Sequence, residues 1–322
     1  MPLPPPLVDR LALPLVAAPM FLISGPELAL ACCRQGIVGS FPALNQRTSE
    51  GFEAWLIQMN ETLAREHRQH PGSVQAPWAV NLVVHRTNPR WQTDLALCVK
   101  HRVPIVITSL GAASQVVDAV HGYGGLVFHD VTTLKHARKA AEAGVDGIIA
   151  VAAGAGGHAG TLNPFVLAHE IRSVFDGTLL LAGGLSHGED ILAAQALGAD
   201  LVYMGTRFIN TLESQAEDAY RNMIIEAEST DIIHTPAVSG VPASFLRQSL
   251  EAAGYPMDKL HQAGEVNYGE KLKPLADEAK AWKTVWSAGQ GVSQIHDVLS
   301  VADLVSRLSR EYRAARARLC QG

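Results

Sequence analysis

The chain has 322 residues, of which 48% are hydrophobic and 18% are charged, and its 26 Lys+Arg and 31 Asp+Glu give a net charge of −5. This composition is typical of a globular protein, and the length suits one barrel of about 250 residues plus an addition. The absence of a basic cluster excludes tight nucleic-acid binding, which needs clustered cations. No segment of the sequence has the pattern of a membrane span or of a signal peptide, so we expect a cytoplasmic protein.

Eight apolar or β-branched runs alternate with helical patterns along the first two thirds of the chain. The expected strands cover residues 15–18, 36–41, 78–83, 104–108, 125–129, 147–151, 178–182 and 200–204. The expected helices cover residues 26–34, 50–68, 93–102, 113–121, 133–143, 164–175 and 188–197, with a last helix over 301–317. Strict alternation indicates parallel strands with right-handed crossovers, and eight such units close naturally into a (β/α)8 TIM barrel of the α/β class. An open, doubly wound sheet is the alternative.

The pattern changes after the eighth expected strand. Helical patterns at 216–228 and 245–253 are separated by extended stretches at 231–234 and 237–241. We therefore predict a smaller, mainly helical domain over residues 213–281, inserted into a barrel formed by residues 1–212 and 282–322. Because the insertion follows a strand at the catalytic end of the barrel, we expect it to form a lid that contacts the loop of His158.

Glycines end the seventh and eighth expected strands. The seventh runs into Gly183 and Gly184, and the eighth into Gly205 and Thr206. Without a Cβ, the backbone N–H groups of glycine can close on an oxyanion. The ends of strands seven and eight are where a TIM barrel usually holds a phosphate. These residues therefore predict a phosphate site.

A glycine-rich loop with one histidine follows the sixth expected strand. It carries Gly154, Gly156, Gly157, His158 and Gly160. A flexible turn with a surface histidine is one interpretation. The position favours a functional loop, because barrel active sites lie at the carboxyl ends of the strands. The loop nearly matches a dinucleotide fingerprint, but no acidic residue follows at the required distance.

Three further strand ends carry candidate residues. Ala18, Pro19 and Met20 could lie beneath a flat ligand or form an ordinary strand exit. Asn81 could offer a hydrogen-bond donor and an acceptor to the edge of a ligand ring, or could form the hydrogen bonds that a loop needs. His129 could be a general base whose pKa is tuned by Asp130, or the two side chains could form a solvated pair. The four cysteines have neither metal-ligand nor disulfide spacing, and we expect no metal.

Several motifs, in chain order, resemble the nitronate monooxygenase (2-nitropropane dioxygenase) family of FMN-dependent barrels. The group includes an NADH:quinone reductase and a flavin-dependent enoyl-ACP reductase. The motifs span about residues 14–291; they are Ala18-Pro19-Met20, Ala155-Gly156-Gly157-His158-Ala159-Gly160, Ala182-Gly183-Gly184, Met204-Gly205-Thr206-Arg207-Phe208 and Ala288-Gly289-Gln290. Two departures from the family pattern are Gly154, where an acidic residue is frequent, and Asp130, where some members carry a cation. A carboxylate at position 130 would not stabilise a reduced, anionic flavin.

The resemblance implies an oxidoreductase that binds FMN, with His158 on the substrate side as the catalytic residue. The cofactor-binding residues it implies are Ala18, Pro19, Met20, Asn81, Gly157, Ala182, Gly183, Gly184, Met204, Gly205, Thr206 and Gln290. The expected reaction is oxidation of nitronates, or of nitroalkanes, with O2 to carbonyl compounds and nitrite.

Several alternatives to this reaction stay open. The first is an NAD(P)H-dependent reductase of the same group that acts on a quinone or an enoyl thioester. The others are a flavin-free barrel aldolase, isomerase or synthase, and a flavin-binding module without turnover. The expected partners are small molecules, and a homodimer is an open alternative.

Overall fold

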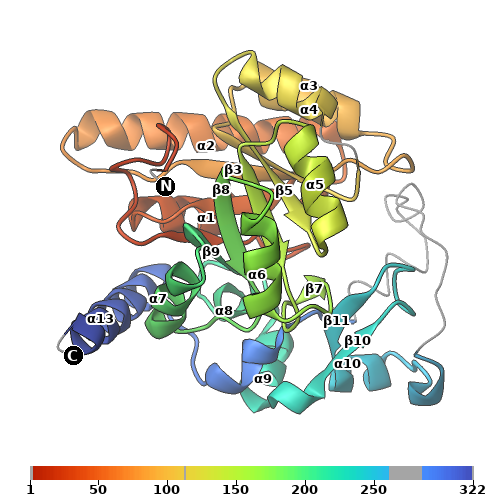
Figure 1. Ribbon diagram of the computed structural model, residues 1–322. Helices are drawn as coiled ribbons and strands as arrows, with labels where there is room; N and C mark the ends of the chain where they lie inside the picture. The colour runs from red at the N-terminus through yellow and green to blue at the C-terminus, as the bar shows by residue number, and fades with distance from the viewer. Residues whose placement is uncertain (1–2, 112–113, 261–284, 321–322) are drawn as a thin grey trace.

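The computed structural model describes residues 3–111, 114–260 and 285–320, and an eight-stranded parallel sheet lies at its centre (Figure 1). Its strands are β1 (Leu15–Ala17), β2 (Gly39–Pro42), β3 (Trp78–Val83), β4 (Ile105–Ser109), β5 (Leu126–Val131), β6 (Gly147–Val151), β8 (Thr178–Ala182) and β9 (Leu201–Met204). They are hydrogen-bonded in the order β1-β9-β8-β6-β5-β4-β3-β2.

The two edges of this sheet meet. Val16 of β1 forms a parallel bridge with Val38, directly before β2, and the N–H of Ala17 donates to the carbonyl of Val38 at 2.8 Å. The sheet is therefore a barrel, which confirms the predicted (β/α)8 fold and rules out the open, doubly wound sheet.

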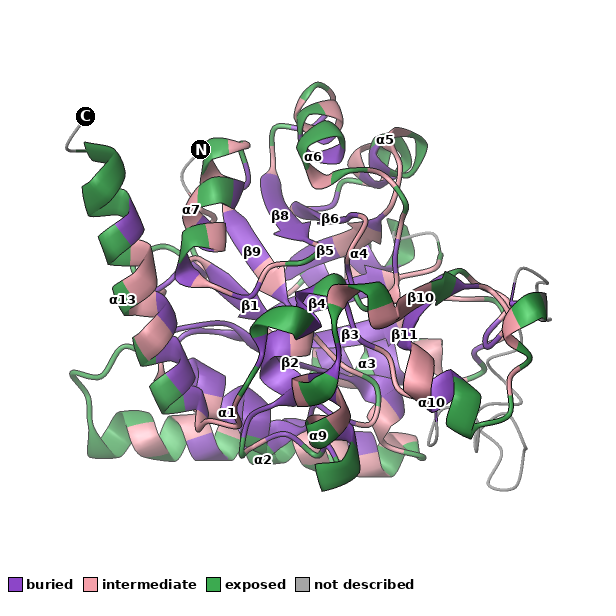
Figure 2. Cartoon of the chain, turned by 90° about the horizontal axis from the view of Figure 1, so that it is seen from below, coloured by how far each residue is buried: buried purple, intermediate pink, exposed green. Residues whose placement is uncertain are grey.

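Helices follow the strands and cover the outside of the barrel, with exposed outer faces and buried inner faces (Figure 2). They are α1 (Pro26–Arg34), α2 (Ser49–Gln69), α3 (Trp91–Lys100), α4 (Ser114–His121), α5 (Leu134–Glu142), α6 (Pro164–Arg172), α7 (Gly188–Ala196), α8 (Thr206–Ile209) and α13 (Val301–Cys320). In α2, Phe52, Leu56 and Met59 recur at helical spacing and are fully buried. Position 113, where we predicted the start of α4, lies outside the described residues. No helix among the described residues is long and apolar enough to span a bilayer.

The barrel interior is filled by apolar side chains. Ile107, Phe128, Ile149 and Leu180 belong to one buried cluster inside the strands. Leu7, from the segment before β1, is fully buried in the same cluster. Because this interior is packed with side chains, ligands can enter only at an end of the barrel.

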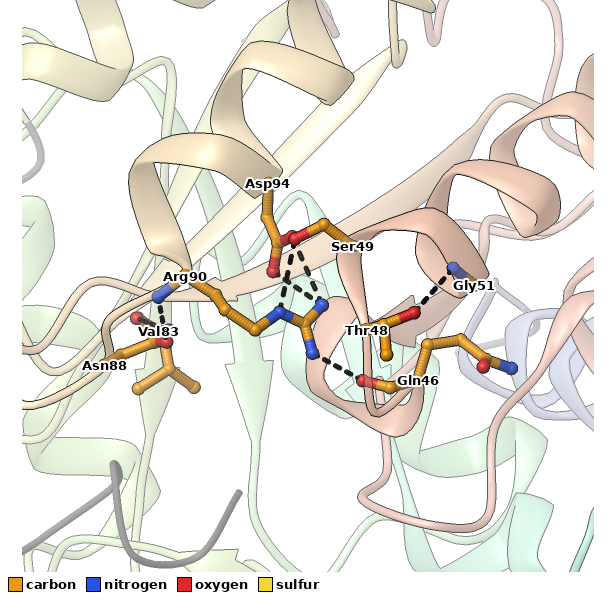
Figure 3. A network of polar contacts seen from close by, with 8 residues as sticks. All are labelled: Gln46, Thr48, Ser49, Gly51, Val83, Asn88, Arg90 and Asp94. Carbon is orange, nitrogen blue, oxygen red and sulfur yellow. Dashed lines mark hydrogen bonds and ion pairs between the residues drawn. The ribbon is translucent and has the colours of Figure 1, made fainter. Parts of the chain in front are cut away.

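A polar network fixes the connections that follow β2 and β3 (Figure 3). Arg90 donates to the carbonyl oxygen of Gln46 at 2.7 Å and to Ser49 Oγ at 3.3 Å, and it forms an ion pair with Asp94 at 3.0 Å. Ser49 also donates to Asp94 at 2.7 Å. The side chains of Ser49, Arg90 and Asp94 therefore all have partners within the protein.

The insertion begins after α8 and contains α9 (Asp218–Glu226), β10 (Ile232–Thr235), β11 (Ala243–Leu246) and α10 (Arg247–Ala252). β10 and β11 form an antiparallel sheet with β7 (Gly157–His158), which belongs to the loop after β6. The predicted contact between the insertion and the loop of His158 is therefore confirmed. Residues 261–281 of the predicted insertion lie outside the described residues.

Two predictions within the insertion were wrong. Residues 237–241 form a turn instead of an extended stretch, and residues 245–253 are not one helix. Phe245 and Leu246 belong to β11, and α10 begins only at Arg247. Short apolar runs have no distinctive periodicity, and pairing with β7 and β10 favours the strand.

Candidate active site

A cavity of about 1090 Å³ opens at the carboxyl ends of the barrel strands. Its walls come from segments far apart in the sequence, because every barrel strand ends at the same face. Of the residues predicted to bind a cofactor or to act in catalysis, those that line it are Ala18, Pro19, Met20, Asn81, Gly157, His158, Ala182, Gly183, Gly184, Met204, Gly205 and Thr206. Gln290 does not line the cavity and is exposed, although its neighbours Gly289 and Gly291 do.

The glycines after β8 and β9 form a concave backbone surface. Gly183 has a φ of +134°, and a Cβ on it would lie 2.6 Å from the carbonyl oxygen of Ala153. Gly184 has a φ of +71°, and no atom lies within 4 Å of the position that its Cβ would take. A left-handed backbone with open space in front suits the close approach of a ligand oxyanion, so this cradle fits a phosphate group.

Gly205 and Thr206 form the second side of the cradle. A Cβ on Gly205 would meet Ala18 Cβ at 3.6 Å, an ordinary contact, so the fold itself does not require glycine there. Thr206 Oγ1 accepts a hydrogen bond from the N–H of Gly289 at 2.9 Å. The hydroxyl proton of Thr206 therefore remains available to a ligand in the cavity.

The segment after β1 is held in place by one amide side chain. Asn45 donates to the carbonyl oxygens of Met20 at 3.0 Å and Ser24 at 2.7 Å, and it accepts from the N–H of Leu22 at 2.9 Å. Leu22 has a φ of +61°. These bonds fix the turn that presents Pro19 and Met20 to the cavity.

His158 is carried on a strand rather than on a free loop. It pairs with Ala243 of β11, and its Nε2 lies 3.4 Å from Ser239 Oγ. The imidazole is only partly exposed and lines the cavity. His158 therefore lies in a short paired strand at the cavity, a position that favours the functional interpretation of this loop.

Close packing explains part of the glycine content of that loop. A Cβ on Gly156 would lie 2.8 Å from the backbone nitrogen of Gly289, in the segment that returns from the insertion. At Gly154 a Cβ would lie 3.1 Å from Gln290 Oε1, and the N–H of Gln290 donates to the carbonyl of Gly154 at 2.9 Å. The returning segment thus occupies the space beside Gly154 that a larger side chain would need.

Three polar side chains from adjacent strands form a chain in the cavity. Asn81 of β3 donates to Ser109 Oγ of β4 at 2.6 Å, and the Ser109 hydroxyl favours the charged form of the Asp130 carboxyl in β5. Burial raises the pKa of Asp130 to about 7, and the Ser109 hydroxyl partly offsets this effect. The Oδ1 atom of Asp130 is buried and has no hydrogen-bond partner among the described residues.

His129 and Asp130 do not act as a pair, contrary to both readings of the sequence. Neighbouring residues of a strand point to opposite faces. The Nδ1 of His129 shares a hydrogen bond of 2.7 Å with Thr108 Oγ1. Burial lowers the pKa of His129 to about 4, so the imidazole is neutral at pH 7 and is not a base tuned by Asp130.

Sequence reasoning missed an aromatic wall. Tyr220 of α9 and Trp286 of the returning segment stack with ring centroids 4.9 Å apart and an interplanar angle of 8°, and both line the cavity. The Tyr220 hydroxyl donates to the carbonyl of Ser287. Ser109 and Tyr203 of the cavity were also missed. Their only sequence signal was a polar residue at the end of an apolar run.

Comparisons with known proteins agree with this architecture. The family model for nitronate monooxygenase matches residues 6–311. A nitronate monooxygenase of Paraburkholderia phytofirmans is 27% identical over 96% of this chain and 94% of that protein. A protein of Mycobacterium tuberculosis named as a monooxygenase is 32% identical, over 51% of this chain and 44% of its own length.

Solved structures show the same fold. The nitroalkane oxidase of Streptomyces ansochromogenes superposes with a TM-score of 0.79 at 24% identity, covering 98% of this chain and 99% of that chain. Because the family model matches nearly the whole chain, this protein belongs to the nitronate monooxygenase family of flavin-dependent oxidoreductases.

Proposed function

We propose that this protein is an FMN-dependent nitronate monooxygenase, which oxidises alkyl nitronates with O2 to carbonyl compounds and nitrite. One observation carries the proposal: a glycine cradle suited to a phosphate and a partly exposed histidine line the same cavity. Bound FMN supplies the electron-accepting chemistry, and the protein's side chains bind, orient and exchange protons.

The cofactor is proposed to be FMN, held without a covalent bond. Gly183, Gly184, Gly205 and Thr206 would bind its phosphate, while Pro19, Met20 and Asn81 would lie beside its ring. The described lining of the cavity supplies one such glycine cradle, which favours a single phosphate. Acid release of the chromophore followed by chromatography tests this proposal. Recovery of FAD, or colour that stays with the precipitate, would contradict it.

His158 is the proposed catalytic residue. Its imidazole can take up the proton next to a nitro group or, when charged, hold nitronate oxygens. A general base contributes roughly 10²–10⁴ in rate, so His158→Asn is expected to lower kcat/KM for a neutral nitroalkane by that factor. The effect on a preformed nitronate should be much smaller.

The comparison of the two substrates also tests the role of His158. Equal losses on nitroalkane and nitronate would indicate that His158 holds the anion instead of removing a proton. Unchanged rates with flavin retained would remove His158 from the mechanism. Oxygen uptake and nitrite formation, followed across pH 5–9, provide both measurements.

The insertion is proposed to act as a lid domain over residues 213–281 and to shape the substrate pocket. Tyr220, Val241 and Pro242 line the cavity, and β11 pairs with the strand that carries His158. Trp286, a few residues after the insertion, also lines the cavity. Replacing Val241 by Phe should therefore lower kcat/KM for bulky nitronates more than for small ones.

A second candidate function is an NAD(P)H-dependent reductase that acts on a quinone or an enoyl thioester. Arg47 and Lys139 line the same cavity, and cations there favour an anionic co-substrate. Anaerobic mixing distinguishes the two functions: bleaching of the flavin by NADH or NADPH, with none by a nitronate, would favour the reductase.

We also propose a cytoplasmic location. All four cysteines are free thiols, and Cys32, Cys33 and Cys98 are buried. Free thiols suit a reducing compartment. Cell fractionation tests the location.

A further inference from the structure

Arg207 belongs to the segment that forms the second side of the glycine cradle, but it does not line the cavity. It directly follows Thr206 in α8, and its side chain is only 3% exposed. Arginine is rarely buried to this extent unless it is paired. The partners of Arg207 therefore lie within the protein, directly after a residue proposed to bind the FMN phosphate.

An ion-pair chain joins Arg207 to the last helix of the protein. The guanidinium of Arg207 lies 2.8 Å from Oδ1 of Asp297, and that of Arg307 in α13 lies 2.6 Å from Oδ2. Each carboxylate oxygen of Asp297 thus holds one arginine. Burial tends to raise the pKa of Asp297, but Arg307 and Arg207 hold it below its usual value. The chain is therefore charged at neutral pH.

The segment that returns from the insertion also holds the residues on both sides of Arg207. The N–H of Gly289 donates to Thr206 Oγ1 at 2.9 Å, and Thr211 forms a parallel bridge with Leu299. Because Asp297 lies between these two contacts in the sequence, α8 is fastened to the returning segment along its length. The ion pair of Arg207 is the charged contact of this set.

The last helix also supports the segment that follows the other side of the cradle. In Figure 1, α13 packs against α7, the helix that follows Gly183 and Gly184. At the first residue of α7, the N–H of Gly188 donates to Glu311 Oε2 at 2.8 Å. Glu311 lies one helical turn after Arg307. Both segments that follow the cradle are therefore fastened to one helix.

Stability alone is a poor explanation for Arg207. Its Nη1 is buried and has no hydrogen-bond partner among the described residues. Burial lowers the pKa of Arg207, and Asp297 only partly offsets this effect. Replacing a buried ion pair by apolar side chains is often neutral or even stabilising. An incompletely paired arginine beside a ligand site therefore favours a role in holding that site.

Resting on the proposed FMN site, we propose that Arg207 is a positioning residue for the cofactor phosphate, because its ion pair with Asp297 holds Thr206 and the first turn of α8 where they bind that group. Arg207 touches neither cofactor nor substrate in this role. Thr206 makes the contact, and its hydroxyl proton is available because the N–H of Gly289 donates to its oxygen.

The test compares FMN with riboflavin, which has the same ring system and no phosphate. Fluorescence quenching gives the Kd of each for the full chain freed of flavin, and the riboflavin-to-FMN ratio of the two Kd values measures the contribution of the phosphate. Arg207→Met should lower this ratio about 10-fold, as expected for one lost charge-assisted hydrogen bond, with riboflavin Kd changed by less than about threefold.

Two further variants distinguish positioning from attraction between charges. Asp297→Ala removes the anchor of Arg207 together with a negative charge, so positioning predicts a lower ratio. A ratio that rises would mean that Arg207 acts through its charge, and would overturn the proposal. Arg207→Met combined with Asp297→Ala leaves no unpaired buried charge and should fold well. Because both residues act through one contact, the double variant should lose no more selectivity than Arg207→Met.

Arg172 provides a matched control at the opposite end of the same strands. It forms an ion pair with Asp200 and donates to the carbonyls of Gly177 and Gly198, both at 2.7 Å, directly before β8 and β9. Arg172 does not line the cavity. Arg172→Met should lower the free energy of unfolding and leave the riboflavin-to-FMN ratio at the wild-type value.

Other results would also overturn the inference alone: a wild-type ratio in Arg207→Met, equal losses of FMN and riboflavin affinity in that variant, or an equally lowered ratio in Arg172→Met. If the wild-type chain binds riboflavin as tightly as FMN, the proposed phosphate cradle fails together with the inference. The two failures are therefore distinguishable.

Discussion

Asp94 is a buried carboxyl and Asp130 a half-buried one, and the protein surrounds them in opposite ways. Asp94 has an ion pair with Arg90 at 3.0 Å and a hydrogen bond from Ser49 at 2.7 Å (Figure 3). Among the described residues, no cation stabilises a charge on Asp130, and its Oδ1 has no hydrogen-bond partner. Burial raises the pKa of both, but in Asp94 the partners stabilise the charged form.

This difference separates a carboxyl whose partners hold two connections of the barrel together from one that lines the cavity. The Asp94 network joins the connections after β2 and β3 and does not line the cavity. Asp130 lines the cavity between strands whose ends carry the proposed cofactor site. A buried polar atom without a partner is costly to stability, so its retention favours a functional role.

The largest effect expected is on stability, from breaking the Asp94 network. Arg90→Met leaves the carboxylate of Asp94 buried without a cation, which typically costs about 3–5 kcal/mol. The free energy of unfolding in urea at pH 7 should fall by that amount, with a smaller loss at pH 5, where protonation of Asp94 is easier. Flavin affinity of the folded variant should not change.

Two controls accompany this experiment. Arg90→Met combined with Asp94→Leu removes both charges and should recover much of the lost stability. Lys100→Met breaks an exposed ion pair with Glu53, whose side chains are 65% and 26% exposed, and should change stability far less. A stability loss in Lys100→Met that equals that of Arg90→Met would contradict the contrast between buried and exposed pairs.

The second prediction concerns the cost of ionising Asp130 in the flavin-free protein. Its folded pKa of about 7 exceeds the ordinary value of 3.8, so the folded state holds a proton that the unfolded state releases. Stability therefore decreases as pH rises through this window. At about 1.4 kcal/mol per unit, wild type should lose about 2–3 kcal/mol relative to Asp130→Asn between pH 5 and pH 8.

Urea unfolding of both proteins at the two pH values provides the measurement. Asp118→Asn removes one charge from the exposed face of α4, away from the cavity, and serves as the control: its curve should run parallel to wild type. If wild type and Asp130→Asn show the same pH dependence, then Asp130 is either solvated or paired in solution.

The barrel and its cradle could be predicted from the sequence, because each signal is local. A run such as that of β6, Gly147–Val151, carries no polar side chain, as expected of a strand covered on both faces. Gly183 and Gly184 stand directly after such a run, and the fold then determines where they lie. The position of His158 in the cavity follows from the same reasoning.

The roles of Asp130 and of β11 could not be predicted in this way. Whether Asp130 pairs with His129 depends on the burial of the strand and on Ser109, which comes from a neighbouring strand. Phe245 and Leu246 form a strand only because β7 and β10 lie beside them. Both outcomes depend on contacts between residues distant in sequence, which no local pattern encodes.

The smallest effect expected comes from Ser109, whose hydroxyl favours the charged form of Asp130 and so lowers its pKa. Ser109→Ala should therefore raise that pKa further. A typical hydrogen bond contributes about 0.5–1.5 kcal/mol, which corresponds to roughly 0.5–1 pH unit. The pH window over which the flavin-free protein loses stability in urea should therefore move upward by about 0.5–1 unit. Ser109→Thr keeps the hydroxyl and should leave this window near that of wild type. A window that moves downward in Ser109→Ala would mean that the Ser109 hydroxyl stabilises the acid rather than the carboxylate.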